Sequence, residues 1–519
     1  MSVSDERNVD VLRQKARILE LENERLGKTV SRLLRENLEL RGMKPDAITL
    51  NLPGLLAQAA GRSEATPKSE RRASRDEKKK KANKPRTGHG PTEQPKLQIK
   101  EEVFTLDEAD KACGVCGKRL ESWAGKDDVV DVVDRIPAQW IIRRCKLEKC
   151  RCPDGCSIVT ADGPKKLVSG GRYSVGVALQ SSLEKFTFHI PIERQVRMAA
   201  LVGMRITSQT LWDQQWELAQ LLKPVAARIK QYILERDWLG ADLTPFLHIK
   251  KGGAVKHQVW QIACPEARHF EVLTAKSAVV GRQVFEVKIE REGEQVSKLF
   301  RGTAVVDGAP ELEKLAAELG FNIANCWSHA RRNVLKANSE APGQVAAFLE
   351  RVAKLYEIER EVAGVDAATP GGYRNKVDLE RLRAARNTES RSAIAAIEKW
   401  ILEQQCIPGG KLKAGLDYVA GRWTKLTKFL DDPRIPLDNN VTEAGFVGLA
   451  QGRRNYVGCR TERGMFVAAT FYTVFESARV CGADPDKYLR YAAESLLDGR
   501  RPLLPHEWLA AGSPDPNTS

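Results

Sequence analysis

The chain has 519 residues, a mass of 57.8 kDa and a formal net charge of +15, with 42% hydrophobic and 29% charged residues. This length allows several domains with at least one sizeable core, and the basic balance favours a polyanionic partner, either nucleic acid or an acidic membrane surface. No apolar run reaches the roughly 18 to 20 residues that a membrane span needs, and the polar N-terminus is unlike a secretory signal, so we expect a soluble cytoplasmic protein.

Residues 1–45 carry a seven-residue repeat of leucine that predicts a coiled coil. The leucines occupy the d positions of the heptad: Leu12, Leu19, Leu26, Leu33 and Leu40. Asn23 and Asn37 fall at a positions, where asparagine costs stability but fixes the register and favours a parallel pair. The repeat therefore predicts self-association, and a single amphipathic helix packed on its own chain is the alternative.

Residues 46–105 form a basic stretch, which contains the run Lys78, Lys79, Lys80 and Lys81. Because this stretch lacks the apolar residues that would offset the entropy of ordering, it is predicted to be a disordered linker. Its cations suit an arm that follows the phosphates of DNA, and a solvated tether is the alternative.

Six of the eleven cysteines fall between residues 113 and 156, which predicts a small zinc-binding module over residues 106–165. Clustered cysteines in a large intracellular chain indicate metal binding rather than disulfides. Zinc takes cysteine pairs about two to four residues apart. The pairs that fit this spacing are Cys113 with Cys116 and Cys152 with Cys156, and Cys150 is a reserve ligand. Four protein ligands predict a structural zinc ion, and ordinary buried cysteines are the alternative.

Residues 166–235 have apolar residues at helical spacing and are predicted to form a helical linking or DNA-binding region. Residues 238–273 are rich in valine, isoleucine and aromatic residues, which predicts strands, with a hairpin turn at residues 250–253. After them, strand and helix patterns alternate, which predicts an α/β sheet. This catalytic domain is expected to span residues 236–482, with a helical insertion at about 340–430.

Within this alternation, we expect a strand over residues 304–306 and a helix over 311–319 that ends at Gly320. A second helix is expected to be capped by Ser328. Residues 483–519 are predicted to be a short C-terminal tail.

Three acidic residues, Asp242, Asp307 and Glu443, are the candidate catalytic residues and metal ligands. Asp242 and Asp307 each end an apolar run that predicts a strand, and Glu443 lies just inside a predicted helix. Three converging carboxylates can hold two divalent cations for in-line attack at a phosphodiester. Each residue alone has a structural alternative, as a turn residue, a strand end or a helix-start carboxylate. Their joint placement predicts an enzyme that cuts and joins DNA.

Basic groups close to these carboxylates are candidate DNA contacts. They are Arg331, Arg332, Arg453 and Arg454. Arginine beside a metal-binding carboxylate suits a phosphate backbone, and a solvated helix end is the alternative. If one helix continued through both residues, Arg454 would share a face with Glu443. His329 is a supporting candidate that could orient a phosphate or a carboxylate, and a core histidine is the alternative.

In these motifs the chain resembles transposases of the bacterial insertion-sequence family 66, the large subunit of the element. The resemblance runs through nearly the whole length, in the family's order. Its core motifs are Gly240-Ala-Asp242-Leu-Thr-Pro, Asp307-Gly, Cys326-Trp-Ser-His-Ala-Arg-Arg, Asp438-Asn-Asn-Val-Thr-Glu443 and Gly452-Arg-Arg-Asn. Its outer motifs are Cys113-Gly-Val-Cys116, Lys149-Cys150-Arg-Cys152 and Leu504-Pro-His-Glu-Trp508.

The resemblance implies an RNase H-like core whose Asp-Asp-Glu triad uses two magnesium or manganese ions to cut element ends and join them to target DNA. It also implies DNA and small accessory proteins of the same element as partners. The chain departs from the family pattern at Leu243, at Ala309 and at Ala444, but the three acidic ligands are retained. A catalytically decayed DNA-binding repressor or architectural protein, and a nuclease without strand joining, are the alternatives.

Overall fold

The computed structural model describes Arg119 and residues 139–515, with gaps at 152, 154–155, 157, 169, 292–293 and 364–377. The predicted coiled coil, the basic linker and most of the zinc-binding module lie outside the described residues. The chain divides into two compact units, Met1–Val132 and Val133–Ser519, and all the helices and strands named below belong to the second. Among the described residues, none of the helices combines the length and the apolar character needed to cross a membrane.

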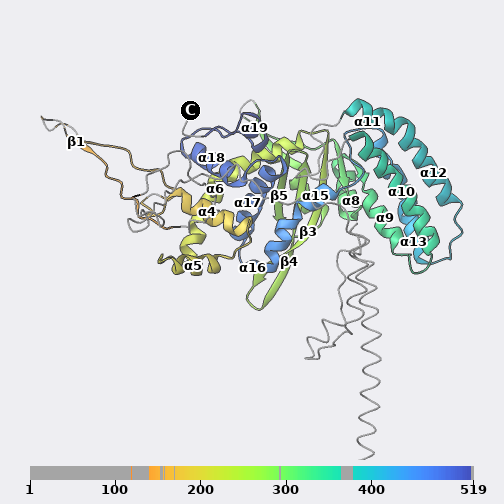
Figure 1. Cartoon of the computed structure of the whole chain (residues 1–519), viewed down its shortest axis with the longest axis horizontal. Coiled ribbons are helices and arrows are strands. Elements are labelled where there is room, and N and C mark those ends of the chain that lie inside the picture. Colours follow the sequence, from red (N-terminus) through yellow and green to blue (C-terminus); the bar gives the residue numbers. More distant parts are fainter. Residues whose placement is uncertain are drawn as a thin grey trace, which may run out of the picture. The chain divides into compact units, whose positions relative to one another are not determined.

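A mixed six-stranded sheet lies at the centre of the second unit (Figure 1). Its strands are β3 (Trp238–Lys250), β4 (Gly253–Cys264), β5 (Ala267–Leu273), β8 (Thr303–Val306), β9 (Asn322–Asn325) and β10 (Gly458–Cys459). The order is β5-β4-β3-β8-β9, and β10 also pairs with β3. The β3–β4 and β4–β5 pairs are antiparallel, whereas β3–β8, β8–β9 and β10–β3 are parallel. The predicted α/β core is therefore confirmed, with a sheet of mixed direction.

The β3–β4 hairpin turns at Lys251 and Gly252, within the predicted residues, and Lys250 pairs with Gly253. Gly252 has a φ of 87°, which glycine adopts without the steric penalty of a side chain. Beyond the first four residues of β4, every residue of that strand is buried. The tip of the hairpin is thus exposed, and the rest of β4 belongs to the protein interior.

Several helices pack with the sheet to form the main hydrophobic core. They are α4 (Val175–Phe186), α6 (Ser208–Leu234), α17 (Glu462–Val480) and α18 (Pro485–Leu497). Helix α17 lies against β5 and α6, and α5 (Ile192–Leu201) packs on α6 (Figure 1). Since α17 is covered from several directions, it is buried along most of its length, including Phe471 and Phe475.

The C-terminal segment is not the short tail that the sequence predicted. After α18, helix α19 (Pro505–Ala510) brings Trp508 into the main core, where its ring contacts those of Tyr488 and Tyr491. The hydroxyl of Tyr488 donates to the carbonyl oxygen of Leu503 at 3.0 Å. Buried aromatic side chains therefore hold this segment to the core, although its end is polar in composition.

Helix α8 (Pro310–Leu319) has the bounds that its local sequence predicts. Proline occupies its first position, where the missing amide hydrogen costs nothing, and Gly320 ends it with a φ of 76°.

Helix α9 (Trp327–Leu335) begins earlier than predicted, because Cys326 and not Ser328 is its N-cap residue. The start is fixed by tertiary contacts of the buried Trp327. Its backbone nitrogen donates to the carbonyl of Leu437 at 3.0 Å, and its indole nitrogen donates to the carbonyl of Leu426 at 2.8 Å. The prediction of a Ser328 cap was therefore wrong.

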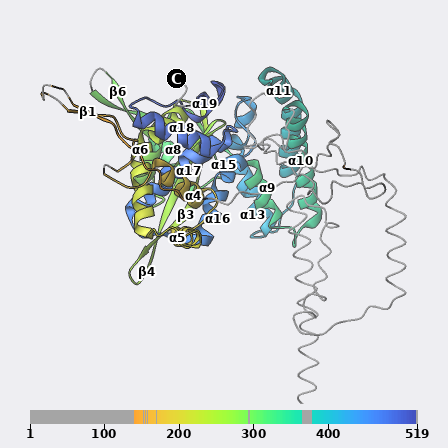
Figure 2. The ribbon, with the colours of Figure 1, turned by 60° about the vertical axis from the view of Figure 1, so that its left-hand side comes forward.

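A second hydrophobic cluster joins α9 to the helices that follow it. These are α10 (Pro342–Ala363), α12 (Arg391–Leu402), α13 (Lys411–Ala420) and α14 (Trp423–Leu426). Helix α11 (Leu379–Ala385) packs on α10. In both views, α10, α11 and α13 gather with α9 to one side of the sheet (Figures 1 and 2). At their centre, Arg386 is 1% exposed and pairs with Glu359.

Apart from two helices that belong to the candidate site, the remaining described elements are short. They are β1 (Lys149–Arg151), β2 (Ile158–Thr160), α7 (Ala278–Gly281), η3 (Arg282–Phe285), β6 (Glu286–Arg291), β7 (Glu294–Leu299), η4 (Arg386–Ser390) and η5 (Lys428–Leu430). The pairs β1–β2 and β6–β7 form two small antiparallel sheets.

Candidate active site

Asp242 lies in β3 at the point where its neighbour β8 ends. The two strands pair in parallel from Trp238 with Thr303 to Gly240 with Val305. The prediction that Asp242 ends a strand is wrong, because β3 continues to Lys250 as one arm of the hairpin. Asp242 does lie just beyond the part of β3 that pairs with β8, however. Its side chain is half-buried, and its Oδ1 accepts a hydrogen bond from the backbone nitrogen of Leu243 at 2.7 Å.

Asp307 directly follows β8, beside Asp242 in the register of the two strands. Its Oδ1 accepts from the backbone nitrogen of Ala309 at 2.8 Å, and its carbonyl oxygen accepts from the hydroxyl of Tyr418 in α13 at 2.8 Å. The next residue, Gly308, has a φ of 93°, and a Cβ there would lie 2.7 Å from the Tyr418 hydroxyl. The close approach of α13 to this turn therefore requires glycine.

Glu443 is carried by α15 (Asn440–Ala444), which packs on β3 and β4. The buried Asn439, just before this helix, donates from Nδ2 to the carbonyl oxygen of Ala241 at 3.1 Å. Thr442 lies over Gly240, where a Cβ would overlap its hydroxyl. These contacts bring the third carboxylate against the strand that carries the first.

Replacing Gly240 by alanine is expected to lower the free energy of unfolding by about 1 to 3 kcal/mol, because the new methyl group must displace Thr442 and α15. Urea unfolding measures the loss. The matched control is Gly253→Ala, where a Cβ meets nothing within 4 Å. Equal stability of the two variants would contradict this account of the close approach.

The three carboxylates share one electrostatic environment. Burial raises the pKa of Asp242 to about 7, and the negative charges of Asp307 and Glu443 contribute in the same direction. Burial also raises the pKa of Glu443; Arg332 opposes this rise, and Asp307 adds to it. Half-buried like charges that influence one another favour protonation or a bound cation. The arrangement thus has the electrostatic character of a cation site.

His329 and Arg332 from α9 face Glu443. His329 Nδ1 lies 3.5 Å from Glu443 Oε1, and Arg332 Nη2 lies 3.9 Å from Glu443 Oε2. Arg332 Nη1 also lies 3.0 Å from His329 Nε2. Burial is the main cause that lowers the pKa of His329, and the positive charge of Arg332 lowers it further. His329 is half-buried, whereas Arg331 and Arg332 are exposed, so both guanidinium groups are accessible to a polyanion.

Arg453 and Arg454 lie on a separate helix, α16 (Phe446–Tyr456). The predicted single helix from Glu443 is divided at Gly445, so the shared face of Glu443 and Arg454 does not follow from helical spacing. Arg453 donates to the carbonyl oxygen of Pro245 and, at 3.3 Å, to the Thr244 hydroxyl. Arg453 therefore holds β3 close to Asp242, and the exposed Arg454 is free of that role.

Three further residues in this region were not among the predicted site residues. Tyr418 holds the backbone of Asp307, Asn439 joins α15 to β3, and the buried Cys326 accepts through Sγ from the backbone nitrogen of Asn439 at 3.2 Å. Cys326 directly follows a buried strand, which is the position that drew attention to Asp307. That signal could have identified Cys326, whereas the other two depend on how distant segments meet.

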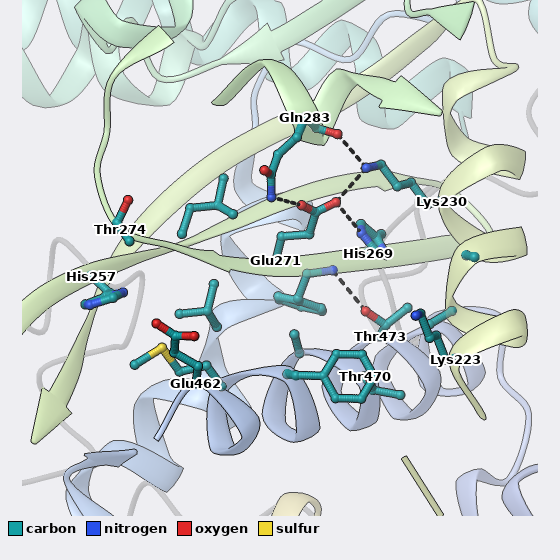
Figure 3. Close-up of a pocket in the computed structure, with 18 residues that line it drawn as sticks. Lys223, Lys230, His257, His269, Glu271, Thr274, Gln283, Glu462, Thr470 and Thr473 are labelled. Carbon is teal, nitrogen blue, oxygen red and sulfur yellow. Dashed lines mark hydrogen bonds and ion pairs between the residues drawn. The ribbon is translucent and has the colours of Figure 1, made fainter. Parts of the chain in front are cut away.

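A pocket of about 470 Å³ lies elsewhere, between α6, β5 and α17 (Figure 3). None of the three carboxylates lines it. Glu271 is at its centre, with Oε1 2.6 Å from Lys230 Nζ and 3.0 Å from His269 Nε2, and Oε2 accepts from Gln283 Nε2 at 2.9 Å. Burial alone would raise the pKa of Glu271, but the bonds from His269 and Lys230 outweigh it and lower the pKa to about 2. We interpret this network as structural.

Replacing Glu271 by glutamine is expected to cost on the order of 2 to 3 kcal/mol of stability at neutral pH. Since the folded pKa lies below the ordinary value of 4.5, this contribution is complete above about pH 4.5 and is lost as the pH falls toward 2. Urea midpoints measured across this range should therefore converge between wild type and variant. The control is Glu318→Gln at an exposed helical position, and a difference that persisted in acid would contradict the assignment.

The other predicted site residues fall largely outside the described residues. This applies to Lys78, Lys79, Lys80 and Lys81, and to the zinc candidates Cys113, Cys116 and Cys152. Cys156 is described and exposed, and Cys150 pairs with Val159 in the β1–β2 hairpin. The zinc module and the basic arm stay predictions.

Comparison with known proteins finds that residues 170–466 match the model of the transposase IS66 family. Three similar proteins come from Sinorhizobium fredii (strain NBRC 101917 / NGR234), each described as uncharacterized. Protein y4jD is 24% identical over 436 residues, covering 78% of this chain and 80% of its own length. Protein y4hP is 24% identical over 432 residues, covering 78% and 75%. Protein y4qI is 25% identical over 441 residues, covering 82% and 76%.

Proposed function

This chain belongs to the transposase IS66 family, a class of DDE enzymes of DNA transposition, and we propose that it cuts the ends of an insertion sequence and joins them to target DNA. The observation that carries this proposal is that Asp307 directly follows β8, the parallel neighbour of β3, and that α15 with Glu443 packs on β3, while both charges contribute to the raised pKa of Asp242. An RNase H-like core is supported by the sheet, in which three antiparallel strands are extended by two parallel ones. The catalytic residues of this reaction are the three carboxylates.

The family implies a divalent metal, and the donor set fits Mg²⁺ or Mn²⁺, which prefer carboxylate oxygens. The fit is supported by Glu443 Oε1, a buried oxygen without a hydrogen-bond partner, and by the raised pKa of Asp242. Asp242 and Asp307 would hold one ion, and Glu443 would complete the site of a second. When bound, such ions activate the attacking oxygen and stabilise the leaving oxygen of a phosphodiester.

The protein's own groups supply binding and orientation. Arg331 and Arg332 are exposed beside Glu443, where guanidinium groups suit DNA phosphates. Arg453 would act through β3 by fixing the strand that carries Asp242, and Arg454 would contact DNA directly. Outside the described residues, we propose that the zinc module and lysine arm bind DNA and that the coiled coil pairs two chains, so that both element ends are held together.

The test is incubation of the full-length protein with DNA that carries an element end, in the presence of Mg²⁺. Wild type is expected to cleave this DNA and to join a pre-cut end to a second DNA, and Glu443→Gln is expected to do neither while binding DNA normally. Cleavage without joining would identify a nuclease instead. Binding without any metal-dependent product would identify a decayed binding protein, and equal products from both proteins would remove Glu443 from the mechanism.

A further inference from the structure

A cluster of three different ligand types lies beside the catalytic carboxylates. Cys326 Sγ, one ring nitrogen of His329 and a carboxylate oxygen of Glu443 all lie within 4.8 Å of one another. Cys326 is the N-cap residue of α9 and His329 follows it by three residues, so both side chains lie on one face of the helix start. Glu443 completes the cluster from α15.

Two atoms of this cluster lack the partners that buried polar atoms normally have. His329 Nδ1 and Glu443 Oε1 are both buried without a hydrogen bond, although they lie only 3.5 Å apart. Most buried polar atoms in folded proteins are satisfied, and an unsatisfied pair that faces each other indicates a missing ligand. A cation between them would satisfy both.

The donor set identifies the class of cation. Thiolate, imidazole and carboxylate together are ligands of zinc and similar transition metals, whereas magnesium takes oxygen ligands alone. The mixed set is therefore unlike the all-carboxylate set of Asp242, Asp307 and Glu443. Three protein ligands leave a fourth tetrahedral position open.

We propose that Cys326, His329 and Glu443 form a second metal site, selective for Zn²⁺-class cations, whose occupation withdraws Glu443 from the catalytic site and inhibits the enzyme. The inhibitory part rests on the proposed function, because it needs Glu443 to serve in catalysis. As the metal–sulfur bond forms, the Cys326 thiol releases its proton to solvent. The site makes zinc a competitor of magnesium through one shared carboxylate.

The binding test uses Co²⁺ as a spectroscopic substitute for zinc, with the full-length protein. Cysteine–Co²⁺ charge-transfer absorption is titrated in wild type, Cys326→Ser and His329→Ala. Wild type is expected to bind one Co²⁺ more per chain than either variant, beyond the ions held by other cysteines. The matched control is Cys264→Ser, which changes another fully buried cysteine and should bind as wild type does. Equal stoichiometry in all four proteins, each with a native circular dichroism spectrum, would overturn the site.

The second test titrates Zn²⁺ against Mg²⁺-dependent cleavage. Wild type and Cys264→Ser are expected to be inhibited, and Cys326→Ser is expected to need at least about tenfold more zinc, because one of three ligands is lost. Identical inhibition of all three proteins would overturn the link between the site and catalysis. If the extra Co²⁺ binds but wild type never cleaves DNA, the proposed function fails while the metal site stands.

Discussion

Replacing Asp307 by asparagine is expected to lower Mg²⁺-dependent cleavage of element-end DNA by at least about a thousandfold. Metal ions in such sites supply several kcal/mol of transition-state stabilisation, and each 1.36 kcal/mol corresponds to about a factor of ten in rate. An amide in place of the carboxylate removes one negative charge from the site without changing the size of the side chain. The effect should therefore appear in the cleavage rate and in the magnesium concentration that is required.

The fold and the affinity for DNA should survive this substitution. Asparagine retains an oxygen that can accept the bond from the backbone nitrogen of Ala309, and the bond from Tyr418 reaches the backbone carbonyl rather than the side chain. Gel-shift binding and circular dichroism check both expectations. The matched control is Asp213→Asn, an exposed aspartate of α6, which should cleave as wild type does. Undiminished cleavage by the Asp307 variant would exclude this residue as a metal ligand.

Replacing Arg386 by methionine is expected to lower the free energy of unfolding by about 3 to 5 kcal/mol, the usual cost of leaving a buried charge without its partner. The Arg386 guanidinium lies at 2.7 and 2.9 Å from the two carboxylate oxygens of Glu359. It also donates to the carbonyl oxygens of Phe429, Asp432 and Ile435. One side chain thus connects α10 and η4 with the segment that leads to α15.

Urea unfolding followed by circular dichroism measures this loss. The control is Arg391→Met, five residues along the chain, where the guanidinium is half exposed and lies 4.0 Å from Asp431. An exposed pair of this kind contributes at most about 1 kcal/mol. Adding Glu359→Leu to the Arg386 variant should recover part of the loss, because the buried charge is then removed. A double variant less stable than the single one would contradict the explanation.

Elements with their own start and stop signals could be predicted from the sequence. Helix α8 is bounded by Pro310 and Gly320, and the β3–β4 turn contains Gly252, so local chemistry alone determined these positions. The start of α9 could not be predicted in this way, because the tertiary bonds of Trp327 move it ahead of Ser328. Local signals compete there with packing, and packing is decisive.

The candidate site likewise has features that local sequence predicts and features that only tertiary contacts determine. The acidic residues stand out by position, whereas their surroundings depend on contacts between distant segments. Asp242 was expected at a strand end, but a strand can outlast one neighbour while pairing with another, as β3 does with β8 and β4. The continuous helix from Glu443 to Arg454 failed at Gly445, against which the side chain of Gln261 packs. The spacing of residues within one helix cannot predict such a contact from a distant strand.

The helices α10 to α14, between Asp307 and Glu443 in the sequence, also contact the candidate site. Tyr418 and Arg422, from the end of α13 and just beyond it, both donate to backbone oxygens of the Asp307–Gly308 turn. A protein shortened by removing these helices would retain Asp242, Asp307 and Glu443. It would nevertheless lose the hydrogen bonds from Tyr418 and Arg422 that hold the backbone at Asp307. We therefore expect the loss of the helical cluster to abolish DNA cleavage as well.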